Sequence, residues 1–168
     1  EKVHKGGAVF NPKRLDWING AYIRKKSLSE LAELCEPYLK LAGFDVALPF
    51  LEKVVALYQE RLKKLSEITE FADFFFKDKL EYSKEILRWK NYTEEDAKDA
   101  LEQCKTIAES VNANDWTKET LEQVFLAKAT AGDRGYLLWP LRVALSGKEA
   151  SAGPFEIASV LGKEKTVE

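Results

Sequence analysis

The chain has 168 residues, 45% of them apolar and 11% aromatic, which is enough to bury one sizeable core or two small ones. Its 26 basic and 28 acidic residues give a net charge of −2, which argues against a protein that coats nucleic acid through a general positive field. The sequence has no run of about 18 apolar residues and no charged-then-apolar leader, so we expect a cytoplasmic protein without a membrane span or signal peptide.

The first part of the chain predicts three helices. An Asn-Pro pair marks the start of the first helix, and apolar residues at helical spacing extend it over about 11–26. Ser27 and Glu30 form a capping box at the start of the second helix, which should end at Gly43, a residue that readily adopts a left-handed C-cap. Apolar residues at intervals of three and four predict the third helix over about 48–65.

The middle of the chain contains a short, strongly apolar segment. Residues 67–76 include four phenylalanines, which are too many for an exposed linker, and they predict a short buried helix joining two halves of the chain. Core packing explains these phenylalanines better than an aromatic binding site does. One or two helical turns are expected over 83–89, followed by a capped helix over 93–111.

Three further helices are predicted towards the end of the chain. The first runs over about 117–132 and the second over 135–146, where Pro140 must either kink or start the helix. The pair Gly153 and Pro154 opens the last helix. Because no segment alternates apolar and polar residues with a period of two, the predicted fold class is all-α, with helices arranged as a bundle or cage.

The sequence lacks the residue sets of common active sites. His4 is the only histidine, which argues against a Ser-His-Asp or Cys-His catalytic arrangement and against a histidine-based metal site. The glycine pair at 6–7 is too short for a phosphate-binding loop. Cys35 and Cys104 have neither metal-site spacing nor a nearby histidine, so we expect buried, reduced side chains. Taken alone, the chain predicts no catalytic residue and no metal site.

Two separated stretches of the chain match one known family. Residues 10–24 read FNPKRLDWINGAYIR. They are similar to the segment that follows the catalytic domain of the glutamyl-tRNA synthetases, of class I and bacterial type. Residues 140–147 read PLRVALSG, and GPFEI at 153–157 and LGKE at 161–164 follow them, as in the C-terminal helices of the same family. The two motifs stand in the family's order and at the family's separation.

The resemblance implies a function in reading tRNA. In that family the C-terminal region is an α-helical cage around the anticodon loop, and an N-terminal nucleotide-binding fold ligates glutamate to tRNA-Glu with ATP and Mg²⁺. The resemblance therefore implies a monomeric partner of tRNA-Glu that binds no DNA, membrane or cofactor of its own. It divides the chain into the end of a stem-contact region at 1–27, a first anticodon-binding helical subdomain at 28–73 and a second, packed on it, at 74–168.

The resemblance also assigns a role to Arg61. This residue matches a position where family members that charge only tRNA-Glu carry an arginine that inspects the last anticodon base. Cytosine presents acceptors there, whereas the guanine of a glutamine anticodon presents donors that would face the all-donor guanidinium. Whether this chain refuses tRNA-Gln stays open. Without the resemblance, a solvated charge on a helix would be the better interpretation.

Other positions match residues near the tRNA. Arg24 matches the stretch near the inner corner of the tRNA, where it would touch phosphate. The remaining matches are an arginine that reaches the anticodon loop and the turn on which anticodon bases lie: Arg142, Ser151, Gly153, Pro154 and Phe155. A proline or aromatic face can stack an unpaired base, and a helix start supplies N–H donors. The sequence departs from the family here, with Ala152 in place of proline, Pro154 in place of an aliphatic residue and Ser146 in place of threonine. For Phe155, core packing is an equal alternative.

Two other functional classes remain open from composition alone. A helical protein-interaction adaptor would show an exposed apolar groove, whereas a tRNA reader should gather Arg61, Arg142 and nearby lysines on one concave face. A self-standing enzyme is the weakest of the three alternatives, because the sequence has one histidine and no phosphate loop.

Overall fold

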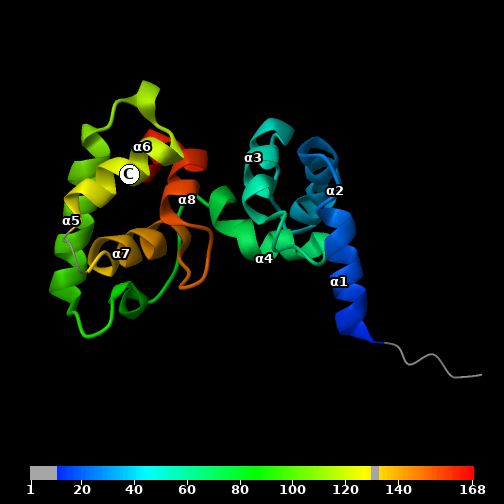
Figure 1. Cartoon of the computed structure of the whole chain (residues 1–168), viewed down its shortest axis with the longest axis horizontal. Coiled ribbons are helices and arrows are strands. Elements are labelled where there is room, and N and C mark those ends of the chain that lie inside the picture. Colours follow the sequence, from blue (N-terminus) through cyan, green and yellow to red (C-terminus); the bar gives the residue numbers. More distant parts are fainter. Residues whose placement is uncertain (1–10, 130–132) are drawn as a thin grey trace, which may run out of the picture. The chain divides into compact units, whose positions relative to one another are not determined.

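The structure is a computed structural model that describes residues 11–129 and 133–168 (Figure 1). In these two ranges every regular element is an α-helix or a 3₁₀ helix and none is a strand, which confirms the all-α prediction. The chain divides into two compact units, residues 1–70 and 71–168, and each has its own core. The roles predicted for residues 1–27, 28–73 and 74–168 stay predictions.

The described part of the first unit contains α1 Pro12–Ile23, α2 Leu28–Leu41, α3 Leu48–Tyr58 and a 3₁₀ turn Leu65–Glu67, and α4 Ile68–Ala72 begins in it and ends in the second unit. The start of α2 is the predicted capping box, because the Glu30 N–H donates to Ser27 Oγ and the Ser27 N–H donates to Glu30 Oε2. After α2, Gly43 has a φ of +87°, as a left-handed helix end requires. The apolar stripes of α2 and α3 face each other and form the core, which includes the fully buried Leu31, Leu39, Leu51, Val54 and Val55.

The predicted third helix is too long, because α3 ends at Tyr58 and not near residue 65. The N–H groups of Arg61 and Leu62 both donate to the Tyr58 carbonyl, at 2.8 and 3.0 Å, and so close a tight turn. Beyond this turn, Glu67 Oε2 accepts from the Lys63 N–H at 2.7 Å and begins the 3₁₀ turn. Leu62 is fully buried although it is not helical. Its apolar side chain fits the helical spacing of the preceding residues, and this is why the sequence pattern predicted a longer helix.

The second unit contains α5 Glu94–Ser110, α6 Lys118–Lys128, α7 Gly135–Ser146, α8 Pro154–Leu161 and α9 Lys163–Val167, with 3₁₀ helices Asp73–Phe76, Lys84–Leu87 and Ala113–Asp115. Its core includes Ala100, Cys104, Leu121, Phe125, Val143, Phe155 and Ile157. The helix α7 continues through Pro140, which is buried inside it, so this proline does not start the helix. The predicted end of the preceding helix at Gly132 lies outside the described residues, and α6 ends at Lys128.

The apolar segment over 67–76 is not one helix. The helix α4 ends at Ala72, whose φ of −125° leaves the helical region, and the 3₁₀ helix Asp73–Phe76 follows. The predicted burial is confirmed, because Phe74 and Phe75 are each 2% exposed and their rings stack with centroids 4.4 Å apart. This stacking places the phenylalanines in the core of the second unit.

The two cysteines are buried as predicted, Cys35 in the first unit and Cys104 in the second. Burial raises the pKa of each thiol to about 12. Both thiols therefore stay protonated at neutral pH and behave as small apolar side chains rather than as nucleophiles or metal ligands.

Candidate nucleic-acid interface

The turn that carries Arg61 is tied to the end of α1. Gln59 Nε2 donates to the Ile23 carbonyl at 3.1 Å and to the Lys26 carbonyl at 2.9 Å. The Ile23 carbonyl also accepts from the Lys26 N–H at 3.1 Å, so the amide adds a second hydrogen bond at the helix end and one to the Lys26 carbonyl beyond it. The Arg61 side chain is exposed, on a backbone that is hydrogen-bonded on both sides of the turn. The turn therefore presents this arginine from a fixed position.

Arg24 lies beside the same turn. Its Nε is 4.0 Å from Glu60 Oε2, and the ion pair is largely exposed. Gly20 leaves room for this arrangement, because a Cβ at that position would lie 3.0 Å from Arg24 Nη1 and 3.3 Å from the Leu62 carbonyl oxygen, which are tight contacts. The first unit thus brings together the segments of two predicted site residues, Arg24 and Arg61.

An open pocket of about 460 Å³ lies at this end of the first unit. Its lining includes Lys26, Lys63 and Lys64 together with Tyr22, whose side chain is 68% exposed. None of these lysines stands in a motif that predicts a tRNA contact. Lysine pairs stand at 25–26 and 63–64 in the sequence, but only the fold shows that Lys26, Lys63 and Lys64 border one pocket.

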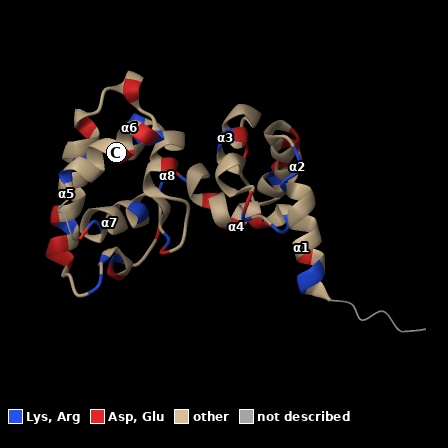
Figure 2. Cartoon of the chain, viewed as in Figure 1, with Lys and Arg blue, Asp and Glu red and all other residues tan. Residues whose placement is uncertain are grey.

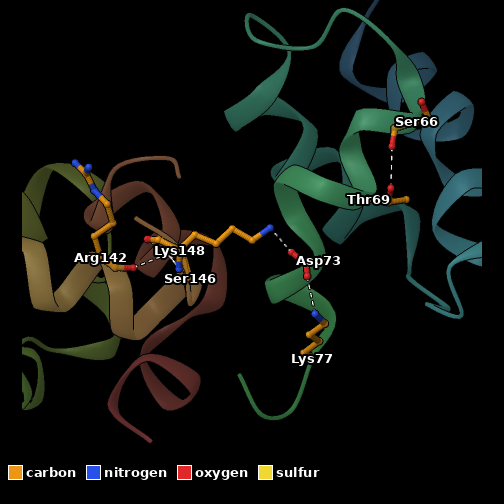
Figure 3. Close-up of polar contacts among 7 residues, drawn as sticks. All are labelled: Ser66, Thr69, Asp73, Lys77, Arg142, Ser146 and Lys148. Carbon is orange, nitrogen blue, oxygen red and sulfur yellow. Dashed lines mark hydrogen bonds and ion pairs between the residues drawn. The ribbon is translucent and has the colours of Figure 1, made fainter. Parts of the chain in front are cut away.

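Arg142 extends from α7 in the second unit and is half-buried. Its Nε is buried and has no hydrogen-bond partner among the described residues. Its guanidinium points to the opposite side of the helix end from the Lys148 side chain (Figure 3). A buried arginine donor without an acceptor costs free energy, and because this Nε is buried, a bound partner would have to meet the other nitrogens of the guanidinium.

The end of α7 is fixed by Ser146, which is 2% exposed. Its Oγ donates to the Arg142 carbonyl at 2.7 Å and accepts from the Lys148 N–H at 3.1 Å. Gly147, between them, has a φ of +67° and ends the helix in the left-handed conformation. One buried hydroxyl therefore joins the last turn of the helix to the loop that follows.

Replacing Ser146 by alanine is expected to lower the free energy of unfolding of the second unit by about 1–2 kcal/mol, because the Lys148 N–H loses its buried acceptor. Urea unfolding followed by circular dichroism measures this loss. Ser146→Thr keeps the hydroxyl and should retain most of the stability. An alanine variant as stable as the wild type would show that the hydroxyl is not needed.

The turn over 151–155 shows which predicted residues are accessible. The Gly153 N–H already donates to Glu156 Oε2 at 2.9 Å, which caps α8. Ser151 and Gly153 are half-buried, whereas Pro154 is buried and Phe155 is 8% exposed. The Phe155 ring packs on Phe125 with centroids 5.5 Å apart. The second position of α8 faces inward, so the structure supports the core alternative for Phe155 and not an open stacking face.

Charge is mixed over both units, and Figure 2 shows basic and acidic residues side by side on most helices. The mixed charge gives neither unit a general positive field, so the candidates for nucleic-acid contact are individual residues, and the roles predicted for Arg24, Arg61 and Arg142 stay predictions.

The described residues contain no group of three or more His, Cys, Asp or Glu placed to hold a metal ion. Within the same residues no helix is both long enough and apolar enough to span a membrane.

Comparison with known proteins identifies relatives of the whole chain. Residues 30–168 match the family model described as the anticodon binding domain. The glutamate–tRNA ligase of Clostridium botulinum is 38% identical over 99% of this chain and 34% of its own length. Glutamate–tRNA ligase 2 of Thermoanaerobacter pseudethanolicus is 32% identical over 100% of this chain and 36% of its own length. The chain thus spans about a third of the length of these relatives, and the resemblance found in the sequence is confirmed.

Solved structures share the fold. The crystal structure of a glutamate tRNA ligase from Elizabethkingia meningosepticum in complex with its amino acid superimposes with a TM-score of 0.80 at 22% identity, over 99% of this chain and 32% of that one. The glutamate-tRNA synthetase of Elizabethkingia anophelis gives a TM-score of 0.77 at 23% identity, over 99% and 32%.

Proposed function

The chain belongs to the anticodon binding domain family, and from this we infer that it reads the anticodon of tRNA-Glu as part of a glutamate–tRNA ligase. The match over residues 30–168 carries the proposal. The rest of the proposed ligase would bind ATP, Mg²⁺ and glutamate and would perform the ligation. This chain would contribute recognition alone, in a monomeric cytoplasmic enzyme.

Selection in the first unit would depend on Arg61. Its side chain is exposed on a turn held by the backbone and by Gln59, so it can meet a base edge without rearranging the fold. A guanidinium has only donors, which pair with the O2 and N3 acceptors of cytosine and oppose the N1 and N2 donors of guanine. Arg24 and the lysines of the neighbouring pocket would contact phosphates.

Contacts in the second unit would come from α7 and the turn after it. The Nε of Arg142 is buried, so the other nitrogens of its guanidinium would donate to an oxygen or nitrogen acceptor of the anticodon loop. Ser151 and Gly153, in the loop after α7, are half-buried and would be the accessible residues of this turn. Because Phe155 and Pro154 are buried, we propose that they support this turn from beneath rather than stack on a base.

The test is binding of the wild-type chain and an Arg61→Ala variant to tRNA-Glu and tRNA-Gln transcripts, measured by fluorescence anisotropy. We expect the wild type to prefer tRNA-Glu and the variant to lose about tenfold of that preference, which corresponds to about 1.4 kcal/mol for one base-edge contact. Arg61→Lys keeps the charge but not the planar fork, so it should lose most of the preference as well.

The matched control is Lys53→Ala, which removes one exposed positive charge from α3. This variant should keep the preference and lose only a little affinity for both tRNAs. An Arg61→Ala variant that behaves like Lys53→Ala would show that Arg61 is a solvated charge. Equal binding of both tRNAs by the wild type would contradict selection by this chain.

The adaptor alternative rests on one observation in the first unit. Several large apolar side chains of α1 and α2 are exposed, among them Trp17 at 68% and Leu41 at 87%. Exposed apolar surface is typical of protein interaction sites. If neither tRNA binds the wild-type chain, this surface makes a protein-interaction function the better proposal.

A further inference from the structure

Asp73 is held by two lysines from different parts of the second unit. Its Oδ1 accepts from Lys148 Nζ at 2.5 Å, and its Oδ2 accepts from Lys77 Nζ at 2.6 Å (Figure 3). Lys148 Nζ also lies 5.8 Å from the centroid of the Phe74 ring. The carboxylate side chain is only 22% exposed, so this bridge is shielded from water more than a surface ion pair is. These contacts therefore hold the side chains of Asp73, Lys77 and Lys148 in one defined arrangement.

This bridge continues into the turn after α7. Lys148 donates its N–H to Ser146 Oγ, and the same hydroxyl donates to the Arg142 carbonyl. A connected set of hydrogen bonds thus runs from Asp73 through Lys148 and Ser146 to the main chain of Arg142. The loop that begins at Gly147 is fixed at its first residues by a carboxylate 75 positions earlier in the chain.

The carboxylate is ionised at neutral pH. Burial by itself would raise the pKa of Asp73, but the hydrogen bonds from Lys148 and Lys77 outweigh it and hold the pKa below its ordinary value. A negative charge close to an RNA-binding surface weakens phosphate attraction, so simple electrostatics gives Asp73 no advantage there. Its advantage lies in ordering the two lysines, each of which it binds with a separate oxygen.

We propose that Asp73 is a positioning residue for tRNA recognition, which acts through Lys148 to fix the turn over 147–153 and the end of α7 that carries Arg142. This inference rests on the proposed function. A positioning role and a general electrostatic role predict opposite changes in RNA affinity when Asp73 is replaced. Loss of an acidic charge alone would tighten RNA binding, whereas loss of the positioning contact weakens it.

The experiment compares Asp73→Asn with Asp78→Asn in binding tRNA-Glu and a tRNA-Glu with altered anticodon bases. Asp78 is exposed and lies in the same unit, so its variant removes an equal charge without removing the lysine bridge. We expect Asp73→Asn to weaken tRNA-Glu binding by about three- to tenfold and to reduce the preference for the natural anticodon. The slope of log affinity against log salt should stay that of the wild type, because no phosphate contact is lost. Asp78→Asn should bind as tightly as the wild type or more tightly.

Lys148→Met and the double variant with Asp73→Asn separate positioning from general destabilisation. All measurements are made at a temperature where circular dichroism shows each variant to be folded. If Asp73 acts through Lys148, the double variant should lose no more affinity than Lys148→Met alone.

The possible outcomes have distinct meanings. Tighter or unchanged binding by Asp73→Asn, or equal losses for both tRNAs, overturns the positioning role and leaves the proposed function intact. Additive losses in the double variant overturn the path through Lys148. A wild-type chain that does not distinguish the two tRNAs contradicts the proposed function itself, and the positioning role with it.

Discussion

Replacing Phe155 by alanine is expected to lower the free energy of unfolding of the second unit by about 3–5 kcal/mol. The ring is 8% exposed and packs on the Phe125 ring, so the substitution removes a buried aromatic contact and leaves a cavity between α6 and α8. The measurement is urea unfolding monitored by circular dichroism, with the midpoint and slope fitted together. A loss of this size is a large share of the stability of an ordinary domain.

The informative control is Phe155→Leu, which keeps most of the buried volume but removes the aromatic face. If Phe155 is a core residue, the leucine variant should fold, should lose much less stability than the alanine variant and should bind tRNA-Glu like the wild type. A leucine variant that folds normally but binds tRNA-Glu about tenfold more weakly would point to base stacking, at odds with the buried ring. The pair of variants therefore decides between the two roles that the sequence left open.

Replacing Gly135 by valine is expected to lower the stability of the second unit by about 3 kcal/mol, near the upper end for overpacking. A Cβ at this position would lie 2.2 Å from Trp89 Cε2, a separation that atoms do not tolerate. The Trp89 ring cannot easily move away, because its Nε1 donates to Asp133 at 3.0 Å and the ring packs on Trp139 with centroids 5.3 Å apart. Urea unfolding of the variant measures the cost.

The same substitution in a Trp89→Ala chain tests whether the loss of stability arises from the clash with the Trp89 indole. In a Trp89→Ala chain the space next to Gly135 is empty, so Gly135→Val should there cost well under half of what it costs in the wild type. This non-additivity is expected of two residues in direct contact. An equal cost in both backgrounds would place the effect in the backbone at the start of α7 instead.

Local signals were sufficient to predict most helices. The capping box of Ser27 and Glu30 and the glycine at position 43 act within one helical turn, so the start and end of α2 can be predicted without knowledge of the fold. The end of α3 could not be predicted in this way. Leu62 is buried from a turn, and a pattern of apolar spacing does not distinguish a buried turn residue from a helical one.

The candidate site was predicted in part. The resemblance identified Arg61, which the structure places on an exposed turn, but its role in selection still depends on the binding test. The orientation of Phe155 depends on the packing of α6 and α8, which no local pattern specifies. The contact of Asp73 with Lys148 joins residues 75 positions apart, and neither residue stands in a motif. Such long-range pairs follow from the tertiary fold alone.

The two hydrogen bonds of Gln59 have a consequence for the entropy of recognition. Because its amide joins the turn to the end of α1, the backbone beneath Arg61 is already ordered before any partner arrives. Binding would then restrict chiefly the arginine side chain, at about 0.5–1.5 kcal/mol, rather than a whole loop. Because little conformational entropy is lost on binding, most of the energetic difference between the two bases would appear as a difference in tRNA affinity. Gln59 is the residue that provides this preorganisation.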